Sequence, residues 1–98
     1  MRFQFEWDEA KAGTNFRKHG ISFRLASSVF SDPAVFTTAG LAHSETEERW
    51  FSVGLAQNGV VLSVAHLWSI LESGLVKVRI INARRSTANE LRYYLESK

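Results

Sequence analysis

The chain has 98 residues, of which 45% are hydrophobic and 12% aromatic, and it contains no cysteine. This length suits a single domain over residues 1–98, and the apolar content predicts a packed core rather than a disordered chain. The absence of cysteine excludes disulfides, thiolate nucleophiles and zinc–thiolate sites. The formal net charge of +2 is too small to indicate a nucleic-acid partner by itself, so the positions of the charges matter more.

Neither a membrane span nor a signal peptide is recognisable in the sequence. No apolar run approaches the roughly 20 residues needed to cross a membrane. Residues 1–8 lack the apolar stretch of a signal peptide. We therefore expect a cytoplasmic protein that does not contact membranes.

The first third of the chain predicts one short strand followed by two helices. Apolar and polar residues alternate over residues 3–7, as in a half-buried strand. Asp8 is placed to cap a helix that runs to His19 and stops at Gly20. Ser22 can cap a second helix, which would end at the only proline. Its apolar face would carry Phe23, Ala26, Val29 and Phe30.

The dipeptide Asn58-Gly59 is the clearest local signal, because it separates two apolar alternating runs. It predicts a two-residue type I′ turn between strands over residues 47–57 and 60–69. In that register Phe51 lies opposite His66. One face of the hairpin would then carry Arg49, Phe51, Val53, Leu55, Leu62, Val64, His66 and Trp68.

Two more strands and a last helix complete the predicted domain. The strands are expected over residues 34–38 and 76–81, with a loop over residues 70–74 before the second. Thr87 and Glu90 form a capping box that begins the helix. Its inward residues would be Ala88, Leu91 and Leu95. The order predicts an α+β domain with a mostly antiparallel sheet and its helices packed on one side.

Basic residues gather at two places in the sequence. Lys11 and Lys18 share one face of the first helix, beside Arg17 and His19. These groups suit phosphate contacts, or those near the end of the helix complement the negative end of its dipole.

The second basic cluster consists of Lys77, Arg79, Arg84 and Arg85, at the fifth strand and its end. Arginine forms bidentate contacts with phosphate, whereas charges on an edge strand also protect against aggregation. We favour phosphate binding, because Arg79 interrupts an apolar strand and a half-buried arginine there needs a partner.

Candidate acid and base groups are His66, which interrupts an apolar strand, and the polar run with His43, Glu47 and Glu48. RNA cleavage needs a base for the 2′-hydroxyl proton, an acid for the 5′-oxygen and cations for the phosphorane charge. The alternatives are surface ion pairs and a hydrogen-bonded structural histidine. No metal-ligand spacing and no glycine-rich phosphate loop occurs, so we expect neither a metal nor a cofactor.

Four motifs, taken together and in order, resemble the BrnT toxin family. Residues 5–11, FEWDEAK, are similar to F-x-W-D-x-x-K, and residues 15–23, NFRKHGISF, to N-x-x-K-H-G-[VI]-[ST]-F. Residues 48–50, ERW, match E-R-[WY], and residues 79–85, RIINARR, resemble R-I-I-S-A-R-[KR]. The chain departs from the pattern at Asn82, where serine is usual. It also departs over residues 67–77, which are longer and more apolar than the usual turn.

The resemblance implies a RelE-like fold with two N-terminal helices and one C-terminal helix. It also implies a ribonuclease toxin of a type II toxin–antitoxin system that cleaves messenger RNA and so inhibits translation. The partner would be a ribbon-helix-helix antitoxin similar to BrnA, in a heterotetramer of two toxins and two antitoxins. The chain would meet DNA only through this antitoxin.

We therefore expect a metal-independent endoribonuclease. Its catalytic residues would be Arg79 and Arg84 for phosphate charge, with acid and base groups drawn from His66, His43, Glu47 and Glu48. Phosphate binding would involve Lys18, Arg49, Lys77 and Arg85. The alternative is a non-catalytic module that binds the antitoxin and tunes its binding to operator DNA.

Overall fold

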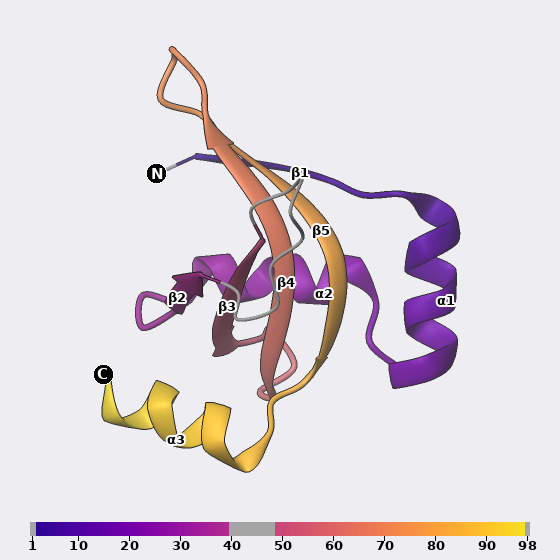
Figure 1. Ribbon diagram of the computed structural model, residues 1–98, viewed down its shortest axis with the longest axis vertical. Coiled ribbons are helices and arrows are strands. Elements are labelled where there is room, and N and C mark those ends of the chain that lie inside the picture. Colours follow the sequence, from indigo (N-terminus) through magenta and orange to yellow (C-terminus); the bar gives the residue numbers. More distant parts are fainter. Residues whose placement is uncertain (1, 40–48, 98) are drawn as a thin grey trace.

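The computed structural model describes residues 2–39 and 49–97 (Figure 1). The elements follow in the order β1 (Phe3–Glu6), α1 (Glu9–His19), α2 (Phe23–Ser27), the 3₁₀ turn η1 (Ser28–Ser31), β2 (Phe36–Ala39), β3 (Trp50–Leu55), β4 (Val61–Ile70), β5 (Val76–Arg85) and α3 (Ala88–Glu96). This order confirms the predicted α+β arrangement, except that the second helix is short and continues as η1. None of the described helices is long and apolar enough to cross a membrane.

The described strands form one sheet in the order β1-β5-β4-β3-β2. β1 runs parallel to β5, and the other neighbouring pairs are antiparallel. The sheet is therefore mixed, although mostly antiparallel as predicted. The strand β5 lies between β1 and β4, so it positions residues from both ends of the chain (Figure 1).

The β3–β4 turn is one residue longer than predicted, and the predicted register was wrong. The N–H of Ala56 bonds to the carbonyl of Val60, and the N–H of Gly59 bonds to that of Ala56, both at 2.9 Å. Gly59 has a φ of 86°, as in a three-residue loop that ends in a left-handed glycine. Trp50, not Phe51, lies opposite His66. Because of the extra loop residue, the β3 residues that were predicted to share a face with His66 lie on the opposite face of the sheet.

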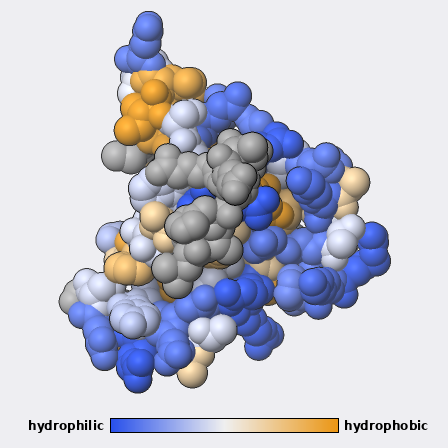
Figure 2. Space-filling model, viewed as in Figure 1, coloured by the Kyte–Doolittle hydropathy of each residue, from blue (hydrophilic) through white to orange (hydrophobic). Residues whose placement is uncertain are grey.

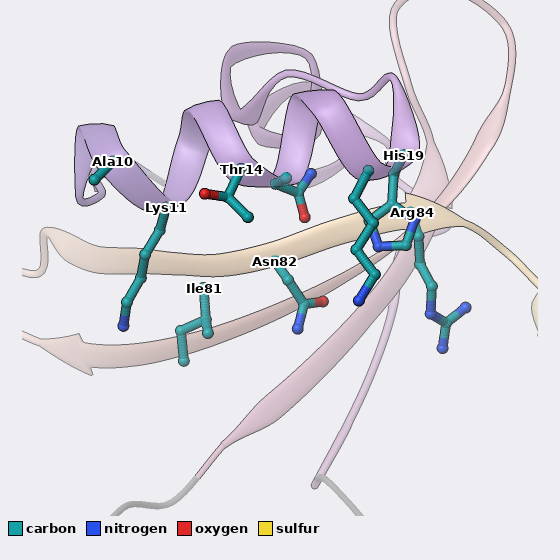
Figure 3. A pocket seen from close by; sticks show the side chains of 9 residues that line it. Ala10, Lys11, Thr14, His19, Ile81, Asn82 and Arg84 are labelled. Atoms are coloured by element: carbon teal, nitrogen blue, oxygen red, sulfur yellow. The ribbon is translucent and has the colours of Figure 1, made fainter.

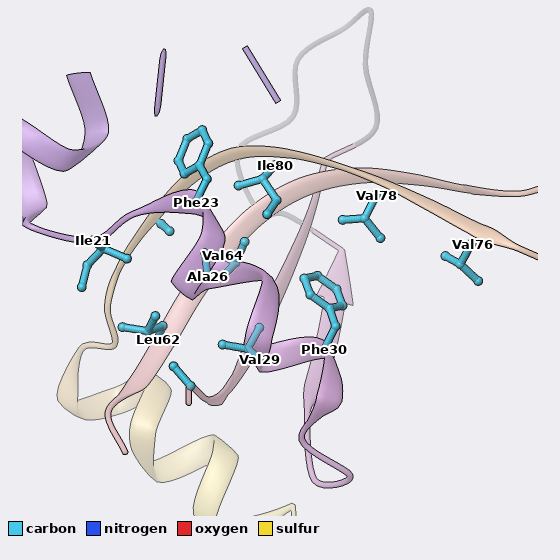
Figure 4. Packing of buried hydrophobic residues seen from close by; sticks show 12 residues of the cluster. Ile21, Phe23, Ala26, Val29, Phe30, Leu62, Val64, Val76, Val78 and Ile80 are labelled. Atoms are coloured by element: carbon cyan, nitrogen blue, oxygen red, sulfur yellow. The ribbon is translucent and has the colours of Figure 1, made fainter. Parts of the chain in front are cut away.

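The core lies on one face of the sheet, beneath α2 and η1 (Figure 4). The predicted apolar face of the second helix is confirmed, since all four of its residues are buried. A bulge in β5 helps to build this core, because Ala65 pairs with Asn82 whereas His66 pairs with Ile80. The buried cluster consists of Ile21, Phe23, Ala26, Val29, Phe30, Ala56, Leu62, Val64, Val76, Val78, Ile80 and Ala83.

The helices do not all pack on one side of the sheet, contrary to the prediction. Ser63 lies between two core residues of β4, so it points to the opposite face, where its hydroxyl donates to Glu90 of α3. The inward residue of α3 is Tyr94, which is buried and donates to Asp32. The predicted inward residues Ala88, Leu91 and Leu95 are exposed instead.

The apolar segment over residues 67–77 forms the far end of the β4–β5 hairpin. Leu71 and Leu75 are joined by a backbone hydrogen bond across the turn, and Gly74 has a φ of 86°. Ile70 and Leu71 are exposed there, and Figure 2 shows an apolar patch near the tip of this hairpin. The expected loop is thus a tight turn between two long strands.

Candidate nucleic-acid interface

Asn15 joins α1 to the edge of β5. It is the buried residue of α1, and its amide donates to the carbonyl of Ala83 at 2.9 Å and accepts from the N–H of Ala83 at 3.0 Å. A further bond reaches the carbonyl of Ile21 at 3.0 Å. The pairing of β1 with β5 ends at Arg79, so Asn15 takes the place of a strand partner beyond that point.

The caps of α1 fix where the helix begins and ends beside β5. The Asp8 carboxylate accepts the N–H of Lys11 at 3.0 Å, and Gly20 stops the helix with a φ of 71°. Both caps confirm the predicted ends. The two lysines predicted to share a face line the same groove, with Lys11 in the first turn of α1 and Lys18 in the last.

A groove with a volume of about 550 Å³ lies between α1 and β5 (Figure 3). The lining is rich in positive and polar groups, and the described residues contribute no carboxylate to it. Among the described residues, the side chains of Lys18 and His19 have no hydrogen-bond or ion-pair partner, so both are available to a ligand. The lining residues are Ala10, Lys11, Thr14, Asn15, Lys18, His19, Ile81, Asn82 and Arg84.

Arg84 is held at the edge of the groove by Glu90. The two guanidinium nitrogens lie 2.7 and 2.8 Å from the two carboxylate oxygens. These hydrogen bonds lower the pKa of Glu90 to about 2, although burial opposes the change. The carboxylate also accepts from Ser63 at 2.9 Å and from the N–H of Thr87 at 2.8 Å.

Lys77 and Arg79 share one carboxylate, that of Glu6 on the neighbouring strand. The ion-pair distances are 3.0 Å for Lys77 and 2.7 Å for Arg79. Hydrogen bonds from Lys77 and then Arg79 lower the pKa of Glu6. Strand alternation places both cations on one face of β5, and the bulge between Ile80 and Asn82 brings Arg84 to the same face. Two cations and one anion leave one excess positive charge there.

The structure separates His66 from these arginines. His66 is fully buried on the core face, and its Nε2 lies 2.8 Å from the Ser52 hydroxyl, which in turn lies 2.8 Å from that of Thr37. Burial lowers the pKa of His66 to about 4. Arg79 lies on the other face of β5, so the two do not meet. The histidine is a polar group of the core in this arrangement.

Two other predicted site residues, Arg49 and Arg85, do not line the groove. Arg49 directly precedes β3, and its buried Nε has no hydrogen-bond partner among the described residues. Arg85 is exposed at the end of β5. The positions of His43, Glu47 and Glu48 lie outside the described residues. Within residues 2–39 and 49–97, no group of three or more His, Asp or Glu side chains is arranged to hold a metal.

Sequence reasoning did not select Asn15 as a site residue, although a signal was present. It lies four residues after Lys11 and three before Lys18, which is the spacing of one helix face. Asparagine is a weak helix former, so its place between the two lysines indicates a side chain with a specific partner.

Comparisons with known proteins identify the family. The family model described as "Ribonuclease toxin, BrnT, of type II toxin-antitoxin system" matches residues 7–90. Among solved structures, the chain is similar to the crystal structure of the Brucella abortus ribonuclease toxin BrnT, with a TM-score of 0.53 and 19% sequence identity. The match covers 89% of this chain and 99% of that chain, and at this identity it shows the fold alone. A comparison with curated proteins found no match. Since the family model spans most of its length, the chain belongs to the BrnT family of ribonuclease toxins of type II toxin–antitoxin systems.

Proposed function

We propose that this toxin acts in the cytoplasm, cleaves RNA without a metal ion, and holds the RNA backbone in the groove between α1 and β5. The observation that carries the proposal is the lining of that groove. Lys11, Lys18, His19 and Arg84 line one cavity, and no carboxylate lines it within residues 2–39 and 49–97. A phosphate backbone is the ligand that such a surface favours.

The groove residues suit attack of a 2′-hydroxyl on the adjacent phosphorus. Lys18 and Arg84 would stabilise the negative charge that develops on the phosphorane oxygens. His19 lines the same groove and would take the proton of the 2′-hydroxyl. His43 stays a predicted acid or base group, and Glu47 or Glu48 stays a predicted alternative base.

Lys77 and Arg79 extend the positive surface along β5. Glu6 neutralises one of these two positive charges. The positive charge that remains suits a phosphate next to the cleaved phosphate in the RNA backbone. We therefore place Arg79 among the phosphate-binding groups and give the main transition-state role to Arg84. Arg49 and Arg85 stay predicted phosphate contacts on either side of this surface.

Side-chain charge supports a mechanism without a metal. A divalent cation in the groove would be repelled by Lys18 and Arg84, and it would find no carboxylate among the lining residues that the structure describes. The cations that stabilise the phosphorane are instead part of the protein itself. This arrangement places the positive charge before the RNA arrives, so it costs no reorganisation during the reaction.

Substitutions in the groove test the site. Lys18→Ala should weaken RNA binding, and Arg84→Ala should lose about 2–4 kcal/mol of transition-state stabilisation. Arg24→Ala is the matched control, because it removes an exposed cation of α2 that does not line the groove. Steady-state cleavage of a defined RNA by the antitoxin-free protein is the measurement. Equal losses in Lys18→Ala and Arg24→Ala would show that overall charge, not the groove, binds RNA.

The resemblance to BrnT toxins supports two further parts of the proposal, a RelE-like fold and a ribbon-helix-helix antitoxin. The antitoxin would present acidic or aromatic groups to the groove, so its association would be fast and sensitive to salt. Since such antitoxins dimerise, we expect two toxins and two antitoxins in the complex. Light scattering on the purified complex measures this stoichiometry, and a 1:1 heterodimer would contradict it.

A further inference from the structure

Glu90 links three elements at the edge of the groove. It is the third residue of α3, where it closes a capping box with Thr87. Its carboxylate also accepts from Ser63 of β4 and from both terminal nitrogens of Arg84 in β5. Ser63 is 2% exposed, so this carboxylate is anchored to a buried group as well as to the helix end. A cap alone requires only the bond to Thr87.

The hydrogen bonds of Arg84 leave one edge of its guanidinium open. Nη1 donates to Glu90 at 2.7 Å and to the carbonyl of Arg85 at 3.3 Å, and Nη2 donates to Glu90 at 2.8 Å. Within the described residues no other partner of Arg84 exists. The donors that remain are Nε–H and the second N–H of Nη2, which lie on the same edge of the planar group. Two parallel donors of this kind match the oxygens of one phosphate.

We propose that Glu90 is a positioning residue for RNA cleavage, which orients Arg84 so that its open edge faces a phosphate in the groove. This inference rests on the proposed function, in which Arg84 stabilises the transition state. Glu90 does not touch the RNA. It restricts the rotamers of a long side chain before the substrate binds, and a misplaced charge loses much of its effect on the reaction.

The loss of the Glu90 charge and the loss of Arg84 orientation should have opposite effects on RNA binding and on the chemical step. This difference distinguishes the proposal from a purely structural role. Removing the negative charge of Glu90 makes the groove more positive, so RNA should bind at least as tightly. Arg84 would no longer be fixed, so the chemical step should slow. A purely structural role predicts a different result, because a loosened helix would weaken binding and catalysis together.

The test compares Glu90→Gln with Thr87→Ala in steady-state RNA cleavage by the antitoxin-free chain. Both variants disturb the capping box, but Thr87→Ala leaves the contact between Arg84 and Glu90 in place. We expect Glu90→Gln to lower kcat by about 10-fold or more, without a rise in KM. Thr87→Ala should lower the denaturation midpoint and leave kcat unchanged. In an Arg84→Ala background, Glu90→Gln should have no further effect on kcat.

Three outcomes would overturn the proposal. One is an equal fall in kcat for Glu90→Gln and Thr87→Ala. Another is a rise in KM with unchanged kcat for Glu90→Gln. The third is a full effect of Glu90→Gln in the Arg84→Ala background.

A second measurement separates this proposal from the proposed function. The Nε–H resonance of Arg84 is followed by NMR while inorganic phosphate is added to the wild-type chain and to Glu90→Gln. We expect a clear shift in the wild type and a smaller one in the variant. If the wild type shows this shift but cleaves no RNA, the proposed function fails, and with it the role of Glu90 in cleavage, while the orientation of Arg84 toward phosphate by Glu90 stands. Equal shifts in both proteins, or none in the wild type, would overturn the positioning role.

Discussion

His66 is a histidine buried between two aromatic rings. Its ring centroid lies 5.0 Å from that of Phe30 and 5.1 Å from that of Trp68, in edge-on contacts. Its hydrogen bond to Ser52 involves one ring nitrogen, and Nδ1 has no partner among the described residues. The charged form would therefore lack both water and a counter-ion, which explains why burial lowers its pKa to about 4.

The stability of the fold should depend on pH through His66. Its pKa is about 4 in the folded chain and near the ordinary 6.5 in the unfolded chain, so the unfolded chain binds more protons between these values. The stabilisation is therefore fully present above pH 6.5 and is lost as the pH falls to about 4, by up to about 3 kcal/mol. Urea denaturation from pH 4.5 to 7.5 measures this loss.

The variant His66→Gln is the control for this dependence, because it keeps a polar side chain and removes the titrating group. Its free energy of unfolding should vary less between pH 6.5 and 4.5 than that of the wild type. The same pH dependence in both proteins would show that another group titrates in this range.

For Arg79, the residue pattern predicted the need for a partner but not the identity of that partner. Arg79 was expected to be half-buried and to need a partner; it is exposed instead, but it does pair with Glu6 at 2.7 Å. The identity of that partner depends on the parallel pairing of β1 with β5, between residues 73 positions apart. No local pattern around Arg79 contains that information.

At the scale of elements, α1 and β5 are joined through the side chain of Asn15. Parallel pairing with β1 covers only the first part of β5, and the edge beyond it would otherwise present unpaired backbone groups. Asn15 satisfies both the N–H and the carbonyl of Ala83. Asn15 thus helps to hold α1 against β5, where the groove lies.

Asn15→Ala should destabilise the fold by about 2–4 kcal/mol, because it removes three hydrogen bonds and leaves backbone groups of Ala83 unpaired. Urea denaturation measures the change. The neighbouring Thr14→Ala is the control, since Thr14 is exposed and should change stability by no more than about 0.5 kcal/mol. Similar midpoints for the two variants would contradict the structural role of Asn15.

The ends of the helices were predictable because a cap depends on residues a few positions apart. Asp8 and Ser22 cap α1 and α2 as predicted, and Thr87 forms the expected capping box with Glu90. The inward face of α3 was not predictable in the same way. Tyr94 is buried because its hydroxyl reaches Asp32, a residue 62 positions earlier in the chain.

The β3–β4 hairpin shows how a correct turn can still give the wrong faces. Asn58-Gly59 marks the turn as predicted, but Gly59 closes a three-residue loop rather than a two-residue one. Both loops favour the same residue types, so composition does not choose between them. A shift of one residue exchanges the two faces of β3, and it places Ser52 rather than Phe51 on the side of His66.

At the scale of the whole molecule, the small net charge conceals an uneven distribution. Glu6 and Glu90 partner the strand cations Lys77, Arg79 and Arg84. Lys18 and His19 have no such partner within the described residues, and they share a groove with Arg84. The net charge of +2 therefore gave little indication of a site that depends on which charges are paired.

The family and the fold class were within reach of the sequence, because motifs spread over most of the chain carry the resemblance. The composition of the groove was only partly predictable. Lys18 and Arg84 were selected as separate candidates, but their meeting depends on how Asn15 places α1 beside β5. The acid and base groups were the least predictable, since the fold decides which histidine is accessible.

The most direct test of the central claim is the cleavage of a defined RNA by the purified, antitoxin-free chain in excess EDTA. A metal-free attack by the 2′-hydroxyl predicts products with a 2′,3′-cyclic phosphate and a 5′-hydroxyl. Replacing the 2′-hydroxyl at the cleaved position with hydrogen should prevent the reaction. Cleavage that appears only after a divalent ion is added would contradict the metal-free mechanism, and no cleavage under any of these conditions would favour a non-catalytic module that tunes DNA binding by the antitoxin.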